Sequence, residues 1–305
     1  MQSSTKRNKS NQINIVLNDY EAQHLKDKQI RKSPLENSFH VIDQHFSKFV
    51  GLEHLKENIK EIYAMRLINE QRQKLGLNCS HQVLHMMFKG NPGTGKTTFA
   101  RTLAQLYYEM KILSKGHIIE VDRADLVGEY IGQTAQKTRK LLRKAIGGIL
   151  FIDEAYSLAR GGEKDFGREA IDSLVKYMED FQEDLVIIMA GYPYEMNYFL
   201  RLNPGLKSRF PFIIEFPDYT VGELMNIAKQ MVFDRDYLLS KSAIRLLKVH
   251  LDEQLSFNMY NFSNARYIRN IVERAIRTQA KRLIGIKDLQ EHDLLLLTSD
   301  DFYFL

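Results

Sequence analysis

A single run of eight residues constrains the fold of this chain more than any other feature. Residues 90–97 read Gly-Asn-Pro-Gly-Thr-Gly-Lys-Thr, after an apolar stretch typical of a β-strand and before a stretch typical of a helix. A Gly-x-x-x-x-Gly-Lys-Thr run in that context is typical of the phosphate-binding P-loop. The alternative is a glycine- and proline-rich loop that matches the run by chance. Because both neighbours fit, the sequence predicts a nucleotide-binding protein.

The chemistry of a P-loop predicts what its residues do. Glycines adopt backbone conformations that other residues resist, so that successive N–H groups converge on phosphate oxygens, and the following helix adds the positive end of its dipole. Lys96 is expected to reach the β- and γ-phosphates, and the Thr97 hydroxyl is expected to bind Mg²⁺. The residues expected to bind the nucleotide are Asn91, Pro92, Gly93, Thr94, Gly95, Lys96, Thr97 and Thr98.

A hydrophobic stretch at 148–152 ends in two acidic residues, Asp153 and Glu154. A P-loop needs a carboxylate partner for Mg²⁺, and Asp153 is expected to position the ion through its water shell. Glu154 is expected to orient and activate the attacking water as a general base. In the alternative interpretation, the two acids only cap the next helix.

Five short apolar stretches alternate with helical ones, at 83–89, 117–121, 148–153, 185–190 and 212–216. This alternation predicts an α/β fold, a P-loop NTPase with a five-stranded, mostly parallel sheet flanked by helices. A helix is expected over 167–180, with one apolar stripe facing the core. Beyond Asp218 the strand signal stops, and Thr220 and Glu223 form a capping box that opens a small, all-helical lid domain.

Three parts are therefore expected along the chain. Residues 1–40 form a polar segment with one short strand at 12–18, residues 41–218 form the α/β nucleotide-binding domain, and residues 219–305 form the helical lid. In the second part, a helix is expected to run to about Leu75 and to end at Gly76.

Composition excludes several classes of protein. The chain has one cysteine, Cys79, so that neither an intramolecular disulfide nor a cysteine-based zinc site is possible. No run approaches the roughly 18 apolar residues of a membrane helix, and the start of the sequence has no apolar core typical of a secretory signal. A cytoplasmic location is expected. The net charge of +5 is interpreted as lysine and arginine spread over helical surfaces rather than as a nucleic-acid site.

Taken together, the P-loop, the Asp-Glu strand, the five strands and the helical lid resemble those of AAA+ ATPases over about residues 45–285. Segments 84–95, 124–137 and 147–167 resemble the branch that contains red-type Rubisco activase and a sporulation protein of endospore-forming bacteria. The resemblance implies Mg²⁺-dependent hydrolysis of ATP to ADP and phosphate, a homo-oligomer with the hexamer as the expected form, and a protein substrate that the sequence does not identify. It also implies a role in spore maturation.

Within this resemblance, Tyr130, Ile131 and Gly132 match the aromatic-hydrophobic-glycine triplet that lines the central pore. An aromatic ring on a glycine-hinged loop can grip an extended polypeptide without reading its sequence. Alternatively, Tyr130 packs on the neighbouring helix. Residues 161–167 match a second pore-facing loop, or they form an ordinary surface turn.

The resemblance also implies roles for two arginines and for the base-contacting segment. Arg209 matches the arginine finger that reaches the γ-phosphate in the adjacent subunit; the alternative is a surface salt bridge. Arg266 matches the lid arginine called sensor 2, with Arg269 one turn along as a weaker rival. Val50 and Gly51 match the segment that contacts adenine.

One departure from the family pattern concerns sensor 1, the asparagine or threonine that polarises the attacking water after the fourth strand. Here the strand ends at 189–193 without such a residue; Asn197 lies too far along, and Tyr192 is only a candidate for the hydroxyl. Sensor 1 stays unassigned.

Four functions remain open from sequence. The first is a ring-forming motor that remodels a protein, with a Rubisco-activase-like chaperone as a variant. The second is an ATP-dependent assembly and recruitment module in which slow hydrolysis is a timer. Nucleic-acid loading is less favoured, because the chain has an aromatic pore triplet and no dense basic patch in its sequence. A small P-loop kinase is less favoured, because it needs neither a helical C-terminal domain nor Arg209 acting in trans.

Overall fold

The structure is a computed structural model, and it describes residues 34–47, 49, 53–79, 82–130, 132–160, 166–257 and 262–302. The chain divides into two units, Met1–His40 and Val41–Leu305. The strand expected at 12–18 lies outside the described residues. Within the described part, no helix has the length and apolar character that crossing a membrane requires.

The second unit is built on a five-stranded sheet in which every neighbouring pair of strands is parallel. The strand order is β2-β3-β4-β1-β5, so that β4 lies between β3 and β1. The predicted α/β sheet is confirmed. The five strands are β1 (Met86–Gly90), β2 (Ile118–Val121), β3 (Ile149–Ile152), β4 (Val186–Gly191) and β5 (Phe212–Phe216).

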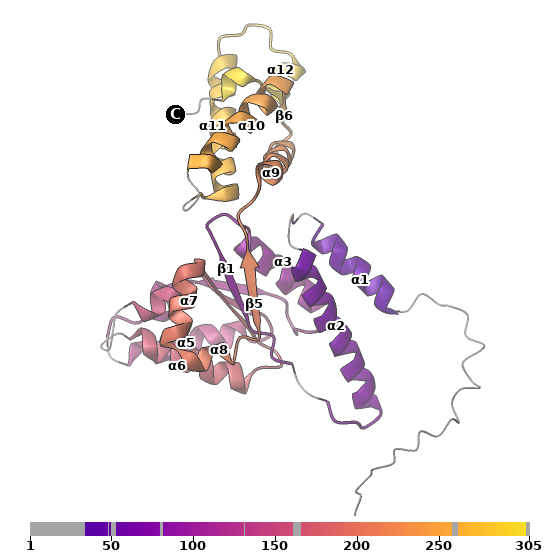
Figure 1. Cartoon of the computed structure of the whole chain (residues 1–305), viewed down its shortest axis with the longest axis vertical. Coiled ribbons are helices and arrows are strands. Elements are labelled where there is room, and N and C mark those ends of the chain that lie inside the picture. The colour runs from indigo at the N-terminus through magenta and orange to yellow at the C-terminus, as the bar shows by residue number, and fades with distance from the viewer. Residues whose placement is uncertain are drawn as a thin grey trace, which may run out of the picture. The chain divides into compact units, whose positions relative to one another are not determined.

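Helices cover both faces of this sheet, as the alternating pattern predicts. In Figure 1, α5 to α8 lie on one side of the sheet, and α2 and α3 lie on the other. The predicted helix over 167–180 is confirmed with the same bounds. The helices of this part are α2 (Glu53–Lys74), α3 (Lys96–Glu109), α4 (Arg123–Leu126), α5 (Gln133–Ala145), the 3₁₀-helix η1 (Ala155–Ala159), α6 (Gly167–Asp180), α7 (Pro193–Leu202) and α8 (Pro204–Lys207).

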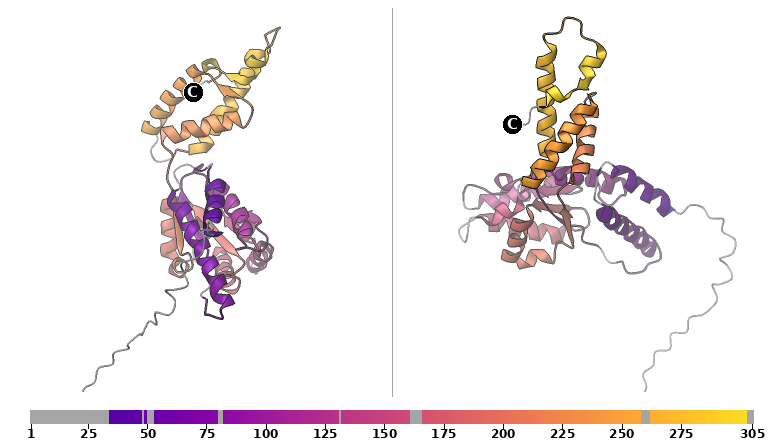
Figure 2. Two further views of the ribbon diagram at one scale, coloured as in Figure 1. Left: turned by 90° about the vertical axis from the view of Figure 1, so that its right-hand side faces the viewer. Right: turned by 45° about the horizontal axis from the view of Figure 1, so that its top comes forward.

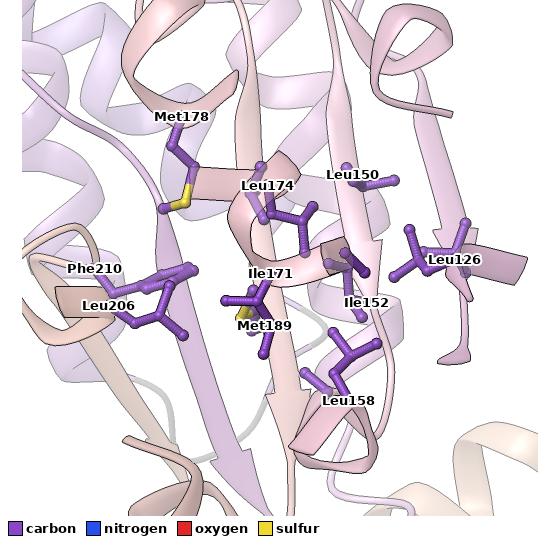
Figure 3. Packing of buried hydrophobic residues seen from close by; sticks show 14 of the residues in the cluster. Leu126, Leu150, Ile152, Leu158, Ile171, Leu174, Met178, Met189, Leu206 and Phe210 are labelled. Carbon is purple, nitrogen blue, oxygen red and sulfur yellow. The ribbon is translucent and has the colours of Figure 1, made fainter. Parts of the chain in front are cut away.

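The two faces of the sheet have different cores. On one face, Leu150, Ile152 and Met189 pack against Ile171 and the rest of the α6 stripe (Figure 3). On the other face, aromatic rings dominate, because Phe99 of α3 contacts the rings of Phe88 and Phe216 at 5.8 and 5.7 Å. Burying side chains of this size contributes about 1.5–3 kcal/mol each, and it holds the strand ends in a fixed order.

The lid is helical, as predicted, and its core lies between α9, α10 and α11, which pack side by side (Figure 2). The capping box is present, because the Thr220 hydroxyl accepts from the Glu223 N–H and the Glu223 carboxylate accepts from the Thr220 N–H. The lid elements are α9 (Val221–Phe233), β6 (Leu238–Leu239), α10 (Lys241–Phe257), α11 (Asn264–Leu283), α12 (Glu291–Leu295), β7 (Leu296–Leu297) and the 3₁₀-helix η3 (Ser299–Asp301).

Two features differ from the expectation. Strands β6 and β7 form a two-stranded parallel sheet inside the lid, where the sequence predicts helices only. Each strand is a pair of leucines, and a two-residue strand is too short to leave an alternating pattern. Helix α1 (Pro34–His45) is also absent from the expectation, and it crosses the predicted boundary at residue 40.

Candidate nucleotide-binding site

The strand order places three predicted site segments next to one another. The carboxyl ends of parallel strands lie at the same edge of a sheet, which is where α/β proteins bind ligands. The P-loop follows β1, Gly191 and Tyr192 stand at the end of β4, and Asp153 follows β3. Because β4 lies between β3 and β1, the end of β4 separates the P-loop from the acidic pair.

The P-loop has the backbone conformation that its glycines allow. Gly93 and Gly95 have φ values of 73° and 94°, in the left-handed region that disfavours other residues. Thr94 is buried, and its hydroxyl donates to the Asn91 carbonyl at 2.8 Å, which closes the loop from inside. Helix α3 begins at Lys96 immediately after this loop, so its free N–H groups lie beside it.

Lys96 lies across the inside of the loop. Its Nζ donates to the carbonyl oxygens of Gly90 and Asn91, each at 2.8 Å. Burial lowers the pKa of Lys96 to about 8, although the negative charge of Asp153 opposes this shift. The ammonium group is therefore partly desolvated and held inside the P-loop by two carbonyl oxygens.

The acidic pair lies at the end of β3, where the backbone turns sharply. Glu154 has a φ of 46°, an unusual conformation for a residue with a side chain, and its N–H donates to the Asp153 carboxylate at 2.9 Å. Such conformations cost about 1–3 kcal/mol and occur most often at functional sites. Burial, with the negative charge of the Glu154 carboxylate as a further cause, raises the pKa of Tyr156 to about 12.

These segments enclose a cavity of about 330 Å³. Its cationic side chains suit a polyphosphate, while its carboxylate and hydroxyl oxygens are the ligands that Mg²⁺ prefers. The residues present therefore fit ATP with Mg²⁺. The cavity is lined by Gly90, Pro92, Gly93, Gly95, Lys96, Thr97, Thr98, Arg101, Asp153, Glu154, Gly191, Tyr192, Ala265, Arg266 and Arg269.

The first turn of α11 closes one side of the cavity. The Ala265 N–H donates to the Gly93 carbonyl at 3.1 Å. A Cβ atom on Gly93 would lie only 2.2 Å from the Ser263 carbonyl oxygen, so only glycine allows this approach. Tyr219 adds a second contact, because its hydroxyl donates to the Thr94 carbonyl at 3.0 Å.

Asn264 connects the lid to the P-loop, and sequence reasoning missed it. It is fully buried with a φ of 49°, and its Nδ2 donates to the Asp218 carboxylate at 2.7 Å and to the Pro92 carbonyl at 3.3 Å. The other oxygen of Asp218 accepts from Asn91 at 2.8 Å. Nothing in the sequence could have indicated this network, because its members come from three distant segments.

The structure brings most predicted site residues together. Arg266 lines the cavity, and so does Arg269, the weaker candidate for the lid arginine called sensor 2. Tyr192, the candidate for sensor 1 at the end of β4, also lines the cavity. Asn197 does not line it, and its Oδ1 accepts a hydrogen bond from Lys89 at 2.6 Å. Val50 and Gly51 lie outside the described residues.

Arg209 does not line the cavity; it lies half-buried directly after α8 and Ser208. Its Nε and Nη2 donate to one Glu179 carboxylate oxygen, at 3.1 and 2.5 Å, and its Nη1 donates to the Gly205 carbonyl at 2.6 Å. In the single chain, this arginine is thus held by an acidic residue of α6.

Tyr130 is 67% exposed, so that most of its ring lies outside the packing of the domain. Its carbonyl accepts from the Gln133 N–H at 3.2 Å, and Gly132, with a φ of 80°, directly precedes α5. Ile131 lies outside the described residues, as do residues 161–165 of the possible second pore loop.

Comparisons with known proteins agree with this site. The family model for the ATPase family associated with various cellular activities (AAA) matches residues 86–218, and the model for the AAA lid domain matches residues 220–304. Stage V sporulation protein K of Bacillus subtilis (strain 168) is 53% identical over 299 residues, which cover 95% of this chain and 93% of that protein.

The chain belongs to the AAA family of ATPases. Two further relatives are similar to this AAA ATPase. The chloroplastic ribulose bisphosphate carboxylase/oxygenase activase of Cyanidioschyzon merolae (strain NIES-3377 / 10D) is 44% identical over 86% of the chain and 89% of its own length. Protein CbbX of Cereibacter sphaeroides is 46% identical over 80% of the chain and 78% of its own length. ATP is accordingly the ligand of the AAA ATPase, with Mg²⁺ as the usual partner ion.

Proposed function

We propose that this AAA ATPase assembles into a ring, with the hexamer as the expected form, and uses ATP hydrolysis to remodel a protein substrate. One observation carries the proposal: Tyr130 is 67% exposed on a short loop that leads directly into α5. An exposed aromatic ring costs solubility unless it has a partner, and an extended polypeptide is a partner that a ring of such side chains can grip.

In this proposal, each polar group of the cavity has one role. Lys96 and the P-loop N–H groups hold the phosphates, and oxygens of Thr97 and Asp153 hold Mg²⁺. The ion would neutralise charge that develops on the phosphates. Glu154 accepts a proton from the attacking water as the general base.

Three arginines complete the proposed site. Arg266 contacts the phosphates from the lid of the same subunit, and Arg269 can supplement it. Arg209 contacts the γ-phosphate bound by the adjacent subunit, so it must leave Glu179 when the ring forms. A cationic donor at that position stabilises charge in the transition state.

The process and location belong to the same proposal. The relation to a protein named for stage V of sporulation supports a role in spore maturation. The single cysteine supports the reducing cytoplasm as the location. The substrate is an unidentified protein. A variant of the proposal is a chaperone that acts on a carboxylase, and the relative that is named as a carboxylase activase supports this variant.

Replacing Tyr130 by alanine tests the proposal. We expect Tyr130→Ala to keep ATP hydrolysis within about twofold, because the side chain is not part of the cavity, and to lose binding of an unfolded polypeptide. Binding is measured by the fluorescence anisotropy of labelled casein in the presence of ATP. For this measurement, the protein also carries Glu154→Gln, which removes the general base and holds the ATP-bound state.

Tyr194→Ala is the matched control, because this tyrosine is 81% exposed on α7. It should leave both readouts unchanged. If the protein is instead a recruitment module that uses slow hydrolysis as a timer, its partners bind outside the Tyr130 loop. Its affinity for casein, high or low, would then be the same with and without the Tyr130 ring. Either of those results contradicts the proposal.

A further inference from the structure

One face of α5 carries four exposed cations and no acid. Arg139, Lys140, Arg143 and Lys144 are all exposed, while the opposite face of the helix is buried against the domain. Their spacing places them within two turns on a single side. With Gln136, they surround a shallow, open depression of about 480 Å³. We call these four residues the basic face.

Some other cations of the domain are paired with an acidic residue, and the basic face is not. Arg101 is paired with Glu120 at 2.5 Å, and Arg209 is paired with Glu179 at 2.5 Å. Among the described residues, no carboxylate lies within ion-pair distance of any member of the basic face. Its positive charge is therefore free to act on a partner.

Folding does not explain this arrangement. Arg139 and Arg143 are four residues apart, and so are Lys140 and Lys144; like charges at that spacing destabilise a helix. The helix dipole offsets the cost only for the last turn, where Arg143 and Lys144 lie. Arg139 and Lys140 gain nothing from it, so the face opposes the stability of its own helix.

The position of the basic face indicates what it contacts. Helix α5 starts directly after Gly132, and the Gln133 N–H bonds back to Tyr130. From Gln133 to Lys144, the helix rises about 16 Å, the length of about five residues of extended chain. A polypeptide held by Tyr130 can therefore reach the basic face.

We infer that the basic face binds an acidic segment of the polypeptide that Tyr130 grips, so that the protein prefers substrates with carboxylates near the gripped stretch. This inference rests on the proposed function and adds a substrate class to it. Four cations match a short run of Asp and Glu by charge complementarity.

A nucleic acid fits this face less well. Duplex binding commonly uses six to ten phosphate contacts, and single-strand binding adds aromatic rings on which bases stack. The exposed positions of α5 hold five cations, the basic face and Lys137, and no aromatic residue.

Two labelled peptides of 20 residues test the inference, one with Glu and one with Lys at every third position. Both are titrated by fluorescence anisotropy into Glu154→Gln with ATP. We expect the acidic peptide to bind at least tenfold more tightly than the basic one. The quadruple variant Arg139→Gln, Lys140→Gln, Arg143→Gln, Lys144→Gln should weaken binding of the acidic peptide about tenfold, since it removes four exposed charge contacts that are each weak.

The control removes four charges elsewhere, with Arg274→Gln, Arg277→Gln, Lys281→Gln and Lys287→Gln. It should change the affinity less than twofold. The double variant Arg139→Gln, Lys140→Gln, with a circular dichroism spectrum like that of the parent, should give an intermediate loss and excludes misfolding as the cause.

Equal losses in both quadruple variants would overturn the inference, because net charge would then be the cause. So would no loss in either variant, or no preference for the acidic peptide. If a 20-nucleotide oligo(dT) binds and only the quadruple α5 variant loses it, the partner is a nucleic acid. The proposed function fails separately, in the casein test of Tyr130→Ala.

Discussion

At the scale of single residues, Lys96 is largely buried, although binding phosphate requires its ammonium group to be charged. Its two carbonyl partners hold the Nζ atom in the P-loop, but removal of water lowers the pKa of Lys96 to about 8. A bound triphosphate favours the charged form, because opposite charges raise the pKa of an ammonium group. Nucleotide binding and protonation of Lys96 are therefore linked.

This linkage predicts how nucleotide affinity depends on pH. Below pH 8, Lys96 is already protonated and affinity should be constant. Above pH 8, binding must take up a proton, so affinity should fall by up to about tenfold per pH unit. Isothermal titration calorimetry with ADP from pH 6.5 to 9.5, in buffers of different ionisation enthalpy, measures both affinity and proton uptake. Constant affinity up to pH 9.5 without proton uptake would contradict the assignment.

The sequence predicts the residues whose chemistry is local, and it misses those whose partners are distant. Lys96, Asp153 and Glu154 belong to short motifs, and all three line one cavity. Asn264 and Asp218 could not be predicted, because they matter only through contacts that folding creates. The same holds for the pairing of Arg209 with Glu179.

At the scale of elements, His85 connects β4 to α6 just before β1 begins. Its Nδ1 accepts from the Ile187 N–H at 3.1 Å, so the ring proton must be on Nε2, which lies 3.2 Å from the Met178 carbonyl. The ring is fully buried, and burial lowers the pKa of His85 to about 4. Protonation would also break the bond from Ile187.

His85 therefore predicts a loss of stability in mild acid. Between pH 6.5 and about 4, the unfolded chain binds a proton at this histidine and the folded chain does not, so the free energy of unfolding falls as pH falls. The complete loss is about 3 kcal/mol, from a pKa of 6.5 in the unfolded chain and about 4 in the folded one.

Urea unfolding at pH 7.5, 6, 5 and 4.5 measures this effect, with His85→Gln as the control that cannot titrate. The control should be less stable at neutral pH but less sensitive to acid. If both proteins lose stability equally as pH falls, another group is responsible.

Helices and strands could be predicted from the sequence where the periodic pattern of apolar residues was long enough. The strands and α6 follow from apolar runs and from a helical stripe, and they occur within a few residues of the expected bounds. The two-residue strands β6 and β7 exist only because tertiary packing aligns Leu238 with Leu296. Helix α1 is mostly polar, but Leu35, Phe39, Ile42 and Phe46 recur at helical spacing and Pro34 stands at its first turn, so that its signal was present but short.

At the scale of the whole molecule, Arg209 does not line the cavity of its own chain, because it is paired with Glu179. In the proposed ring, each subunit supplies Arg209 to the site of its neighbour. A head-to-tail interface of this kind makes two different inactive subunits complementary. Activity then depends on assembly as well as on the P-loop.

The most direct measurement of this account is ATPase activity in a mixture of Arg209→Ala and Glu154→Gln. Each variant alone should be inactive. In mixed rings, an Arg209→Ala subunit keeps its general base and receives Arg209 from a Glu154→Gln neighbour. An equimolar mixture should recover about a quarter of wild-type activity. With random mixing, about one interface in four joins an Arg209→Ala site to a Glu154→Gln neighbour that supplies Arg209. Activity no higher than the sum of the separate variants would show that Arg209 does not act across subunits.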